Sequence, residues 1–228
     1  MNPPLPITPE EDPVQIIDEW LKEATQKGIQ RHPNSMTLAT VNISGQPSAR
    51  VVLLKSLSVN KGFGVFYTHY GSQKGIDISN NSTVSAVMHW DQLGRQVRLE
   101  GEAVRSPANE SDEYFMTRPW HSQLNAWVSE QSQSLANPID LVCRAEDKAR
   151  DLKLPDPTDT AFNELELNKS HITRPPFWGG YRLWFAAIEL WTEGAGRFHH
   201  RIRYERTLSP INAYTFQASA WKSGYLQP

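Results

Sequence analysis

The spacing of apolar residues predicts a chain that opens with one helix and continues as short strands. Residues 13–27 carry apolar side chains at helical intervals, with Asp12 in capping position and Gly28 after the last turn. Alternation of period two replaces this spacing at residues 36–43. The strands predicted in this part are 36–43, 47–54, 62–70, 83–90 and 95–104, with a short helix at 73–80.

The second part of the chain mixes helices with extended segments. Helices are predicted at 109–117, 122–131 and 138–152, and Pro119 separates the first two. Residues 155–169 read as irregular, residues 181–191 and 198–207 as a closing hairpin, and residues 214–221 as a last strand. Turns every ten residues or so favour an antiparallel barrel over a parallel sheet. We therefore expect a mainly β, α+β fold, with a flexible segment at 1–12 and one domain at 13–228.

Composition and charge narrow the function classes. The chain has 228 residues, a net charge of −2 and an isoelectric point near 6.4, so it lacks the basic excess typical of proteins that bind nucleic acid or anionic membranes. A single cysteine, Cys143, excludes an internal disulfide, and scattered histidines argue against a metal site. No apolar run is long enough to span a bilayer. We expect a soluble cytoplasmic protein.

Residues 189–201 (E-L-W-T-E-G-A-G-R-F-H-H-R) are a candidate ligand-binding site. In an extended chain Arg197, His199 and Arg201 share one face, where stacked cations would repel unless a flat or anionic ligand lay across them. A solvated edge strand protected by its charges explains the same residues equally well.

A second candidate lies where two predicted helices meet. Tyr114 and Arg118 are four residues apart on one helix face, and Ser122 follows the proline break, which suits a phosphate or carboxylate. Taken alone, an arginine paired with a nearby acid is the simpler interpretation. No glycine-rich nucleotide loop and no Gly-x-Ser-x-Gly elbow is present.

Seven segments in order resemble the pyridoxine/pyridoxamine 5′-phosphate oxidase family, over nearly the whole chain from residue 36. They are R-V-V-L-L-K (50–55), F-Y-T-H-Y-G-S-Q-K (66–74), R-Q-V-R-L-E-G (95–101), S-D-E-Y-F-M-T-R-P (111–119), S-Q-L-N-A-W-V-S-E-Q-S (122–132), W-G-G-Y-R (178–182) and E-L-W with R-F-H-H-R (189–201). The resemblance implies an FMN-binding split β-barrel with flanking helices. It further implies a homodimer with FMN at the subunit interface and dioxygen as the oxidant.

The same resemblance implies which residues carry the chemistry. Flavin contacts would come from Arg50, Val51, Leu53, Lys55, Tyr67, Thr68, Lys74, Gln96, Gln131, Ser132, Trp191 and Arg201. Substrate contacts would come from Lys55, Tyr114, Arg118, Ser122, Arg197 and His199, of which Arg197 and His199 are the candidate catalytic pair. Cations suit the FMN phosphate, and donors such as Gln96 and Arg201 suit the negative charge that reduction leaves on the flavin.

Departures from the family pattern point to a changed substrate. Members that make pyridoxal phosphate usually carry Gln after E-[FL]-W and the motif R-L-H-D-R, whereas this chain has Thr192, Phe198 and His200, and Gln73 replaces an arginine of S-R-K. The phenazine-biosynthesis oxidases, which oxidise reduced phenazine carboxylic acids, are a branch of this kind and are the favoured reading. A pyridoxine/pyridoxamine 5′-phosphate oxidase is the alternative, because Tyr114 and Arg118 are retained. A non-catalytic flavin-binding module is the third.

Overall fold

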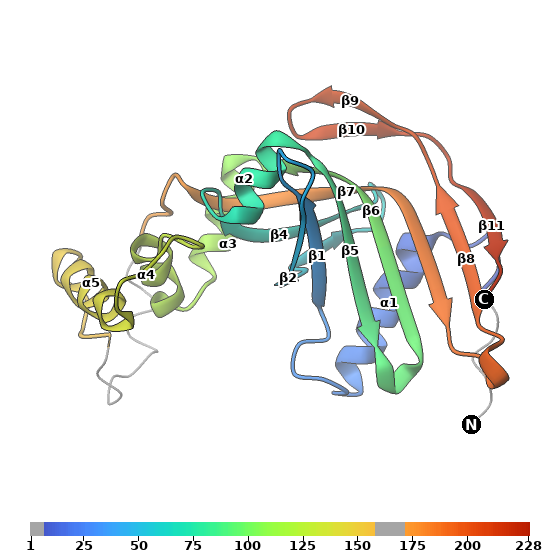
Figure 1. Ribbon diagram of the computed structural model, residues 1–228, viewed down its shortest axis with the longest axis horizontal. Coiled ribbons are helices and arrows are strands. Elements are labelled where there is room, and N and C mark those ends of the chain that lie inside the picture. Colours follow the sequence, from blue (N-terminus) through green and yellow to red (C-terminus); the bar gives the residue numbers. More distant parts are fainter. Residues whose placement is uncertain (1–6, 158–171) are drawn as a thin grey trace. The chain divides into compact units, whose positions relative to one another are not determined.

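The structure is a computed structural model that describes residues 7–157 and 172–228. The elements are labelled in Figure 1 where there is room. The helices of the described part are α1 (Pro13–Gln26), α2 (Gln73–Asn80), α3 (Ala108–Met116), α4 (Trp120–Val128) and α5 (Pro138–Asp151), with short 3-10 turns η1 (Asp91–Leu93) and η2 (Ala195–Arg197). The strands are β1 (Ser35–Val41), β2 (Pro47–Leu53), β3 (Ser56–Ser58), β4 (Phe63–His69), β5 (Thr83–Trp90), β6 (Arg95–Arg105), β7 (Trp178–Thr192), β8 (His200–Glu205), β9 (Leu208–Asn212), β10 (Thr215–Ala218) and β11 (Lys222–Leu226).

Most strands join one sheet in the order β11-β8-β7-β6-β5-β1-β2, while β3 pairs with β4 and β4 pairs with β7. The ladders β1–β2, β1–β5, β5–β6, β6–β7, β7–β8 and β8–β11 are all antiparallel. The strands β9 and β10 form a separate hairpin. The predicted class, an α+β fold built on an antiparallel sheet of the split-barrel type, is therefore confirmed.

The described residues divide into two compact units. The first contains residues 7–66, 77–105 and 181–228, and so holds α1 and most of the sheet. The second contains residues 67–76, 106–157 and 172–180, and so holds α3, α4 and α5. The prediction of a single domain over residues 13–228 stays a prediction.

Helix α1 forms where the apolar spacing predicted it. The Asp12 side chain accepts a hydrogen bond from the Val14 backbone N–H at 2.8 Å, and a proline occupies the first turn. Its buried face includes Ile17 and Trp20, and the Trp20 ring meets Trp90 of β5 edge-on, with 6.4 Å between ring centroids. Burying such rings is the main source of stability for a helix of this length.

The second unit has its own small core. Helices α3 and α4 contribute the buried residues Phe115, Trp120 and Leu124, and these pack with Ala149 of α5 and with Trp178 at the start of β7. Figure 1 shows α4 and α5 lying side by side. This apolar cluster fixes the helix–proline–helix junction at Pro119, which matters for the site below.

A β-bulge interrupts the β6–β7 ladder between Glu100 and Gly101. Glu100 pairs with Ala187 but Gly101 pairs with Phe185, so β7 has one extra residue, Ala186, at this point. A Cβ atom on Gly101 would lie 1.8 Å from the Trp184 carbonyl oxygen, so only glycine permits this close approach of the two backbones.

Three sequence predictions were wrong at element boundaries. Helix α4 starts at Trp120, directly after the proline, and ends at Val128, so Gln131 and Ser132 lie in the following turn and do not end a helix. Strand β8 begins at His200 because the turn η2 takes up the residues before Phe198. The last predicted strand, 214–221, contains the shorter strand β10 and the loop after it, and it is not the last strand, because β11 follows.

Residues 158–171 lie outside the described residues, and they include most of the segment predicted to be irregular, 155–169. Of the segment predicted to be flexible, residues 7–12 are described, and the carbonyls of Thr8 and Pro9 accept hydrogen bonds from Tyr204 at 3.0 Å and Ser223 at 2.8 Å. Among the described helices, none is both long enough and apolar enough to cross a bilayer.

Candidate functional site

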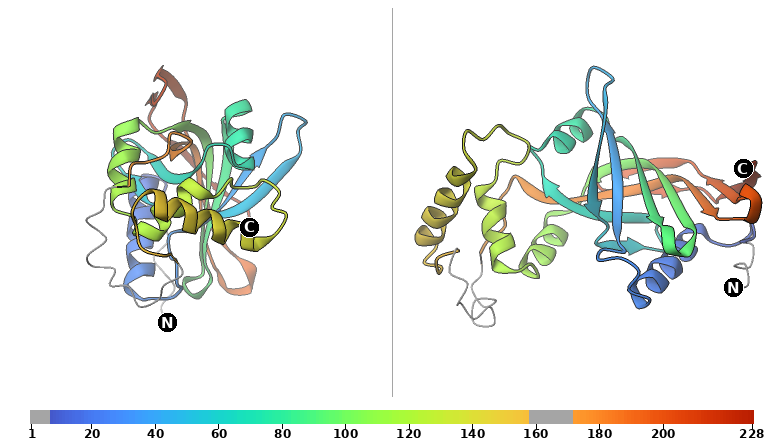
Figure 2. Two further views of the ribbon diagram at one scale, coloured as in Figure 1. Left: turned by 90° about the vertical axis from the view of Figure 1, so that its left-hand side faces the viewer. Right: turned by 60° about the horizontal axis from the view of Figure 1, so that its bottom comes forward.

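The sheet places three of the predicted flavin residues in one row. Gln96 of β6 pairs with Trp191 of β7, and Trp191 pairs with Arg201 of β8. Because paired residues point to the same face of a sheet, an amide, an indole and a guanidinium lie side by side on three neighbouring strands. The β7–β8 hairpin in Figure 2, drawn in orange to red, carries two of them. Such a row can present donors and a flat apolar ring to one ligand.

The turn that joins β7 to β8 holds the candidate catalytic pair. Arg197 has φ of 67°, a left-handed conformation that is costly for a residue with a Cβ, and it follows Gly196 at φ of 61°. A Cβ on Gly194 would lie 1.8 Å from the Phe198 carbonyl oxygen, so the turn closes tightly on itself. This turn therefore positions Arg197 and His199. The sequence-based expectation that strand alternation places them on one face with Arg201 was wrong, because neither residue lies in a strand.

His199 is held by two contacts. The Gly194 backbone N–H donates to His199 Nδ1 at 3.3 Å, and the imidazole lies beside the Trp191 ring with 4.7 Å between centroids. A ring nitrogen that accepts a hydrogen bond carries no proton, so the neutral imidazole has its proton on Nε2. The turn thus presents His199 as a donor through Nε2.

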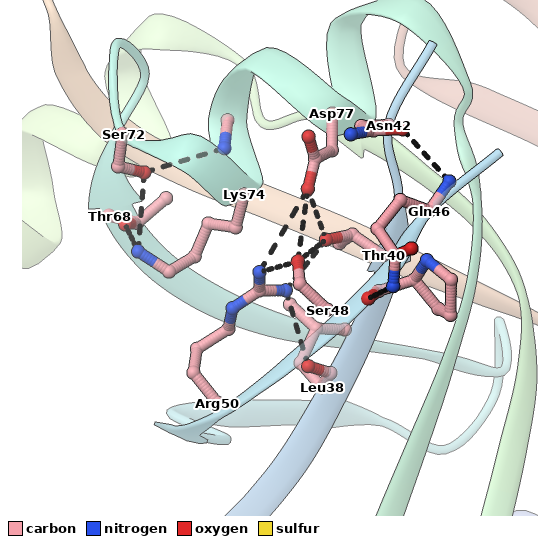
Figure 3. A network of polar contacts seen from close by, with 12 residues as sticks. Leu38, Thr40, Asn42, Gln46, Ser48, Arg50, Thr68, Ser72, Lys74 and Asp77 are labelled. Atoms are coloured by element: carbon pink, nitrogen blue, oxygen red, sulfur yellow. Dashed lines mark hydrogen bonds and ion pairs between the residues drawn. The ribbon is translucent and has the colours of Figure 1, made fainter. Parts of the chain in front are cut away.

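Arg50 of β2 is anchored by neighbours on β1, β2 and α2 (Figure 3). Its Nη1 donates to Thr40 Oγ1 at 2.7 Å, its Nη2 donates to Ser48 Oγ at 2.5 Å, and Asp77 lies 3.9 Å from Nη2. Burial lowers the pKa of Arg50, and the attraction of the Asp77 carboxylate opposes this. The guanidinium stays charged, and these contacts fix its position.

In the second unit, Lys74 gathers residues that are distant in sequence. Its Nζ donates to Gln131 Oε1 at 2.9 Å, to Thr68 Oγ1 at 3.1 Å and to Ser72 Oγ at 3.2 Å, and the residue is only 6% exposed. Figure 3 shows Lys74 with Thr68 and Ser72. Three of the predicted flavin residues, Thr68, Lys74 and Gln131, therefore meet. A buried ammonium beside hydroxyl and amide groups is the kind of cation that binds an anion.

An aromatic stack fills the neighbourhood of Arg118. The rings of Tyr67 and Tyr114 stack with 3.8 Å between centroids, and both are parallel to Trp178 within 12°. The Arg118 guanidinium lies 4.5 Å from the centroid of Trp178 and 5.6 Å from that of Phe115. Cation–π contacts of this kind hold a guanidinium in place without neutralising its charge.

Arg118 departs from the simpler sequence interpretation. Its buried Nη1 has no hydrogen-bond partner among the described residues, where an acid had been expected. Burial lowers the pKa of Arg118, and the nearby Tyr114 opposes this. A buried donor without a partner costs about 1–3 kcal/mol, and an anionic ligand would relieve that cost. We conclude that Arg118 is a candidate anion receptor.

The remaining predicted residues lie in varied settings. Val51 and Lys55 are exposed and Leu53 is half-buried, all three at or just after strand β2. Ser122 is half-buried on α4, and its backbone N–H donates to the Pro119 carbonyl. Ser132 is exposed with φ of 74° in the turn after α4.

Two acidic residues were missed by sequence reasoning. Glu189 of β7 is 2% exposed and accepts hydrogen bonds from Arg98 and Arg201. Asp77 of α2 is also buried and anchors Arg50 and Thr40. The signal for Glu189 was available, because it is a lone acid inside the apolar run F-A-A-I-E-L-W. Nothing in the local pattern marked Asp77.

Comparisons with known proteins cover nearly the whole chain. Residues 21–148 match the family model described as pyridoxamine 5′-phosphate oxidase, and residues 178–228 match the one described as the pyridoxine 5′-phosphate oxidase C-terminal dimerisation region. The chain is 44% identical to pyridoxine/pyridoxamine 5′-phosphate oxidase of Bordetella pertussis, over 85% of this chain and 82% of that protein. It is 39% identical to the protein of the same name from Rubrobacter xylanophilus, over 95% and 87%.

Two solved structures share the fold. PhzG from Burkholderia lata, solved with tetrahydrophenazine-1-carboxylic acid, aligns with a TM-score of 0.77 at 28% identity, over 96% of this chain and 94% of that one. A pyridoxamine 5′-phosphate oxidase-related, FMN-binding protein from Nostoc punctiforme aligns with a TM-score of 0.67 over 97% and 100%, and at 13% identity it supports the fold alone.

Proposed function

Because this chain belongs to the pyridoxamine 5′-phosphate oxidase family, we propose that it is an FMN-dependent oxidase that acts on a reduced, anionic heteroaromatic substrate. The substrate class that we put first is a reduced phenazine carboxylic acid. The proposed working unit is a homodimer, which the match of residues 178–228 to a dimerisation region supports.

Each unit, taken by itself, holds residues of the kind that bind a part of FMN. In the second unit, buried Lys74 with Thr68 and Gln131 forms the kind of donor set that binds a phosphate. In the first unit, Arg50 is a second fixed cation, and the row of Gln96, Trp191 and Arg201 offers donors beside an indole, which suits the polar edge of an isoalloxazine. We propose these as the cofactor contacts, together with Val51, Leu53, Lys55, Tyr67 and Ser132.

The observation that carries the substrate proposal is Arg118 Nη1, which is buried and has no hydrogen-bond partner among residues 7–157 and 172–228. A buried guanidinium beside a tyrosine hydroxyl favours an anionic group on the substrate, whether carboxylate or phosphate. Tyr114 and Ser122 are the proposed partners in holding that anion, and Lys55 is the proposed further cation on the substrate side.

The reaction we propose is SH₂ + O₂ → S + H₂O₂. Bound FMN supplies the electron acceptor that takes a hydride from the substrate and passes the electrons to dioxygen. The turn holding Arg197 and His199 would orient the substrate, with the guanidinium countering its negative charge and His199 donating through Nε2. Gln96 and Arg201 would stabilise the negative charge that reduction leaves on the flavin.

The proposal of a phenazine substrate is supported by one exposed side chain and by one similar solved structure. The Phe198 side chain, between Arg197 and His199, is 77% exposed, and an exposed ring at that point can stack on a large flat substrate. PhzG of Burkholderia lata, solved with tetrahydrophenazine-1-carboxylic acid, aligns with 96% of the chain. The loss of family residues at Phe198 and His200 is consistent with a changed substrate.

A vitamin B6 phosphate, pyridoxine or pyridoxamine 5′-phosphate, is the second candidate, and specific observations favour it. Tyr114 and Arg118 both lie against Trp178, and a guanidinium and a phenol are groups that can bind a phosphate monoester. Curated relatives at 39–44% identity carry that name, a higher identity than the 28% to PhzG. Both substrates therefore belong in the same experiment.

The experiment is a parallel turnover assay on purified FMN-loaded protein. Oxygen consumption and peroxide formation are followed with pyridoxine 5′-phosphate, pyridoxamine 5′-phosphate and a reduced phenazine carboxylic acid, each against an enzyme-free blank because reduced phenazines react with air unaided. The anaerobic flavin is expected to bleach with the true substrate and to recover in air. A flavin that no candidate bleaches would support a carrier and refute the oxidase, and a protein that binds no FMN would refute the cofactor.

A further inference from the structure

Glu189 joins three neighbouring strands through one carboxylate. Its Oε1 accepts hydrogen bonds from Arg201 Nε at 2.9 Å and from Arg201 Nη2 at 2.7 Å, both from β8. Its Oε2 accepts one from Arg98 Nη1 of β6 at 2.9 Å. The Glu189 side chain is 2% exposed, whereas that of Arg201 is 26% exposed. The acid is therefore buried beneath an arginine that reaches the surface of the sheet.

These bonds fix the orientation of the Arg201 guanidinium as well as its place. Two of its nitrogens bind the same carboxylate oxygen, and Nη1 donates to the Gln227 carbonyl at 2.9 Å. A guanidinium has five N–H groups, and the part of the chain that the structure describes uses three of them, so one N–H on Nη1 and one on Nη2 can bind a ligand. A planar fork held on two sides loses little further conformational entropy when it binds.

Stability alone is a poor explanation for the arrangement. Glu189 is flanked by apolar residues in β7, and a buried ion pair is often no more stabilising than apolar residues of the same volume. Two arginines share this one buried carboxylate, although Arg98 also reaches Glu100 at 3.1 Å. The geometry is explained if the position of Arg201, in the row with Gln96 and Trp191, has to be exact for binding.

We propose that Glu189 is a positioning residue that sets the Arg201 guanidinium for contact with the flavin. This inference rests on the proposed function, because it takes Arg201 to be a cofactor contact. Glu189 itself touches neither flavin nor substrate in this account, and acts only through Arg201.

A double-mutant cycle on FMN affinity tests the proposal. The dissociation constant of FMN is measured by flavin fluorescence for the wild type, Glu189→Gln, Arg201→Gln and the double variant. Glutamine keeps the shape of Glu189 but turns one acceptor into a donor that faces an arginine. We expect Glu189→Gln to weaken FMN binding about tenfold, and to change it less than about twofold once Arg201 is already glutamine.

Glu205→Gln is the matched control. Glu205 pairs with Arg203 Nε at 2.7 Å on the same sheet, but its side chain is 63% exposed. Glu205→Gln removes one negative charge, as Glu189→Gln does, so an effect of net charge alone on FMN affinity would appear in both variants. We expect Glu205→Gln to change FMN affinity less than about twofold.

The outcomes separate this inference from the function on which it rests. If the wild type binds no FMN, or Arg201→Gln binds it normally, the proposed cofactor contact fails and the inference fails with it. If Arg201→Gln is weakened but Glu189→Gln is not, or if the two effects simply add, only the positioning role is refuted. Should Glu189→Gln not fold, Glu189→Asp keeps the charge and shortens the reach, and unchanged FMN affinity in that variant refutes the proposal.

Discussion

Replacing Arg197 with glycine should separate the conformational cost of the turn from its function. Arg197 has a left-handed backbone at φ of 67°, and its side chain is exposed. For a residue with a Cβ this conformation costs about 1–2 kcal/mol. Glycine removes that cost but gives the unfolded chain more freedom, worth about 0.5–1 kcal/mol. Arg197→Gly should therefore raise the free energy of unfolding by about 0.5–1 kcal/mol relative to Arg197→Ala, which keeps the Cβ.

Urea unfolding and turnover together are the assay. A gain of that size moves the urea midpoint up by about 0.3 M for an m-value of roughly 2–3 kcal/mol/M. Both Arg197 variants should lose most of their turnover while keeping their flavin, because the proposed role of the guanidinium is on the substrate side. That result would mean that the protein keeps arginine at position 197 for turnover, although glycine there makes the fold more stable.

Lys153 provides the matched control. It also has positive φ, at 55°, directly after the C-cap of α5, where its N–H donates to the Arg150 carbonyl. Lys153→Gly should have a free energy of unfolding higher than that of Lys153→Ala by the same amount, and its turnover should equal that of the wild type. If Lys153→Gly gains and Arg197→Gly does not, the strain argument at Arg197 is wrong. If Arg197→Gly turns over like the wild type, its side chain has no part in the reaction.

Three further predictions follow from the contacts of single side chains. Lys74→Met should raise the dissociation constant of FMN at least about tenfold, seen by fluorescence titration, since it removes the buried cation of the phosphate site; unchanged affinity would contradict that assignment. Arg118→Ala should raise KM for the anionic substrate by about tenfold or more with flavin content retained, and a loss of flavin instead would move Arg118 to the cofactor. Tyr204→Phe should lose less of its free energy of unfolding at high pH than the wild type does. Burial raises the pKa of Tyr204 to about 12, so the stability that comes from the neutral hydroxyl is fully present below about pH 10 and is lost as the pH rises toward 12. Chemical denaturation at pH 9 and 11.5 measures this, and equal losses in the two proteins would refute it.

Elements set by local pattern could be predicted from the sequence. Helix α1 has its cap at Asp12 and its stop at Gly28 within its own neighbourhood, and strand β5 alternates along its whole length. Both were predicted to within one residue at each end. The choice between strand and helix at these places depends on residues no more than four apart, which is the range that periodicity measures.

Contacts between distant segments could not be derived in this way. Lys74 meets Gln131, 57 positions away, and no spacing rule connects a short helix with a turn beyond α4. The residues had been grouped only through the family resemblance. The geometry of Arg197 was beyond periodicity for another reason, because the fold of that turn depends on the contact of Gly194 with the Phe198 carbonyl and not on alternation.

The extra residue in β7, Ala186, changes which residues of the strand lie on which face of the sheet. On its carboxyl-terminal side, odd-numbered residues such as Glu189 share a face with even-numbered Arg98 of β6, and on its amino-terminal side odd-numbered Phe185 pairs with odd-numbered Gly101. One strand can thus send odd positions to the charged face in one half and to the apolar interior in the other. Removing Ala186 would shift the register by one residue and turn the side chains of one half of β7 to the opposite face, so the length of β7 at this point is constrained independently of its side chains.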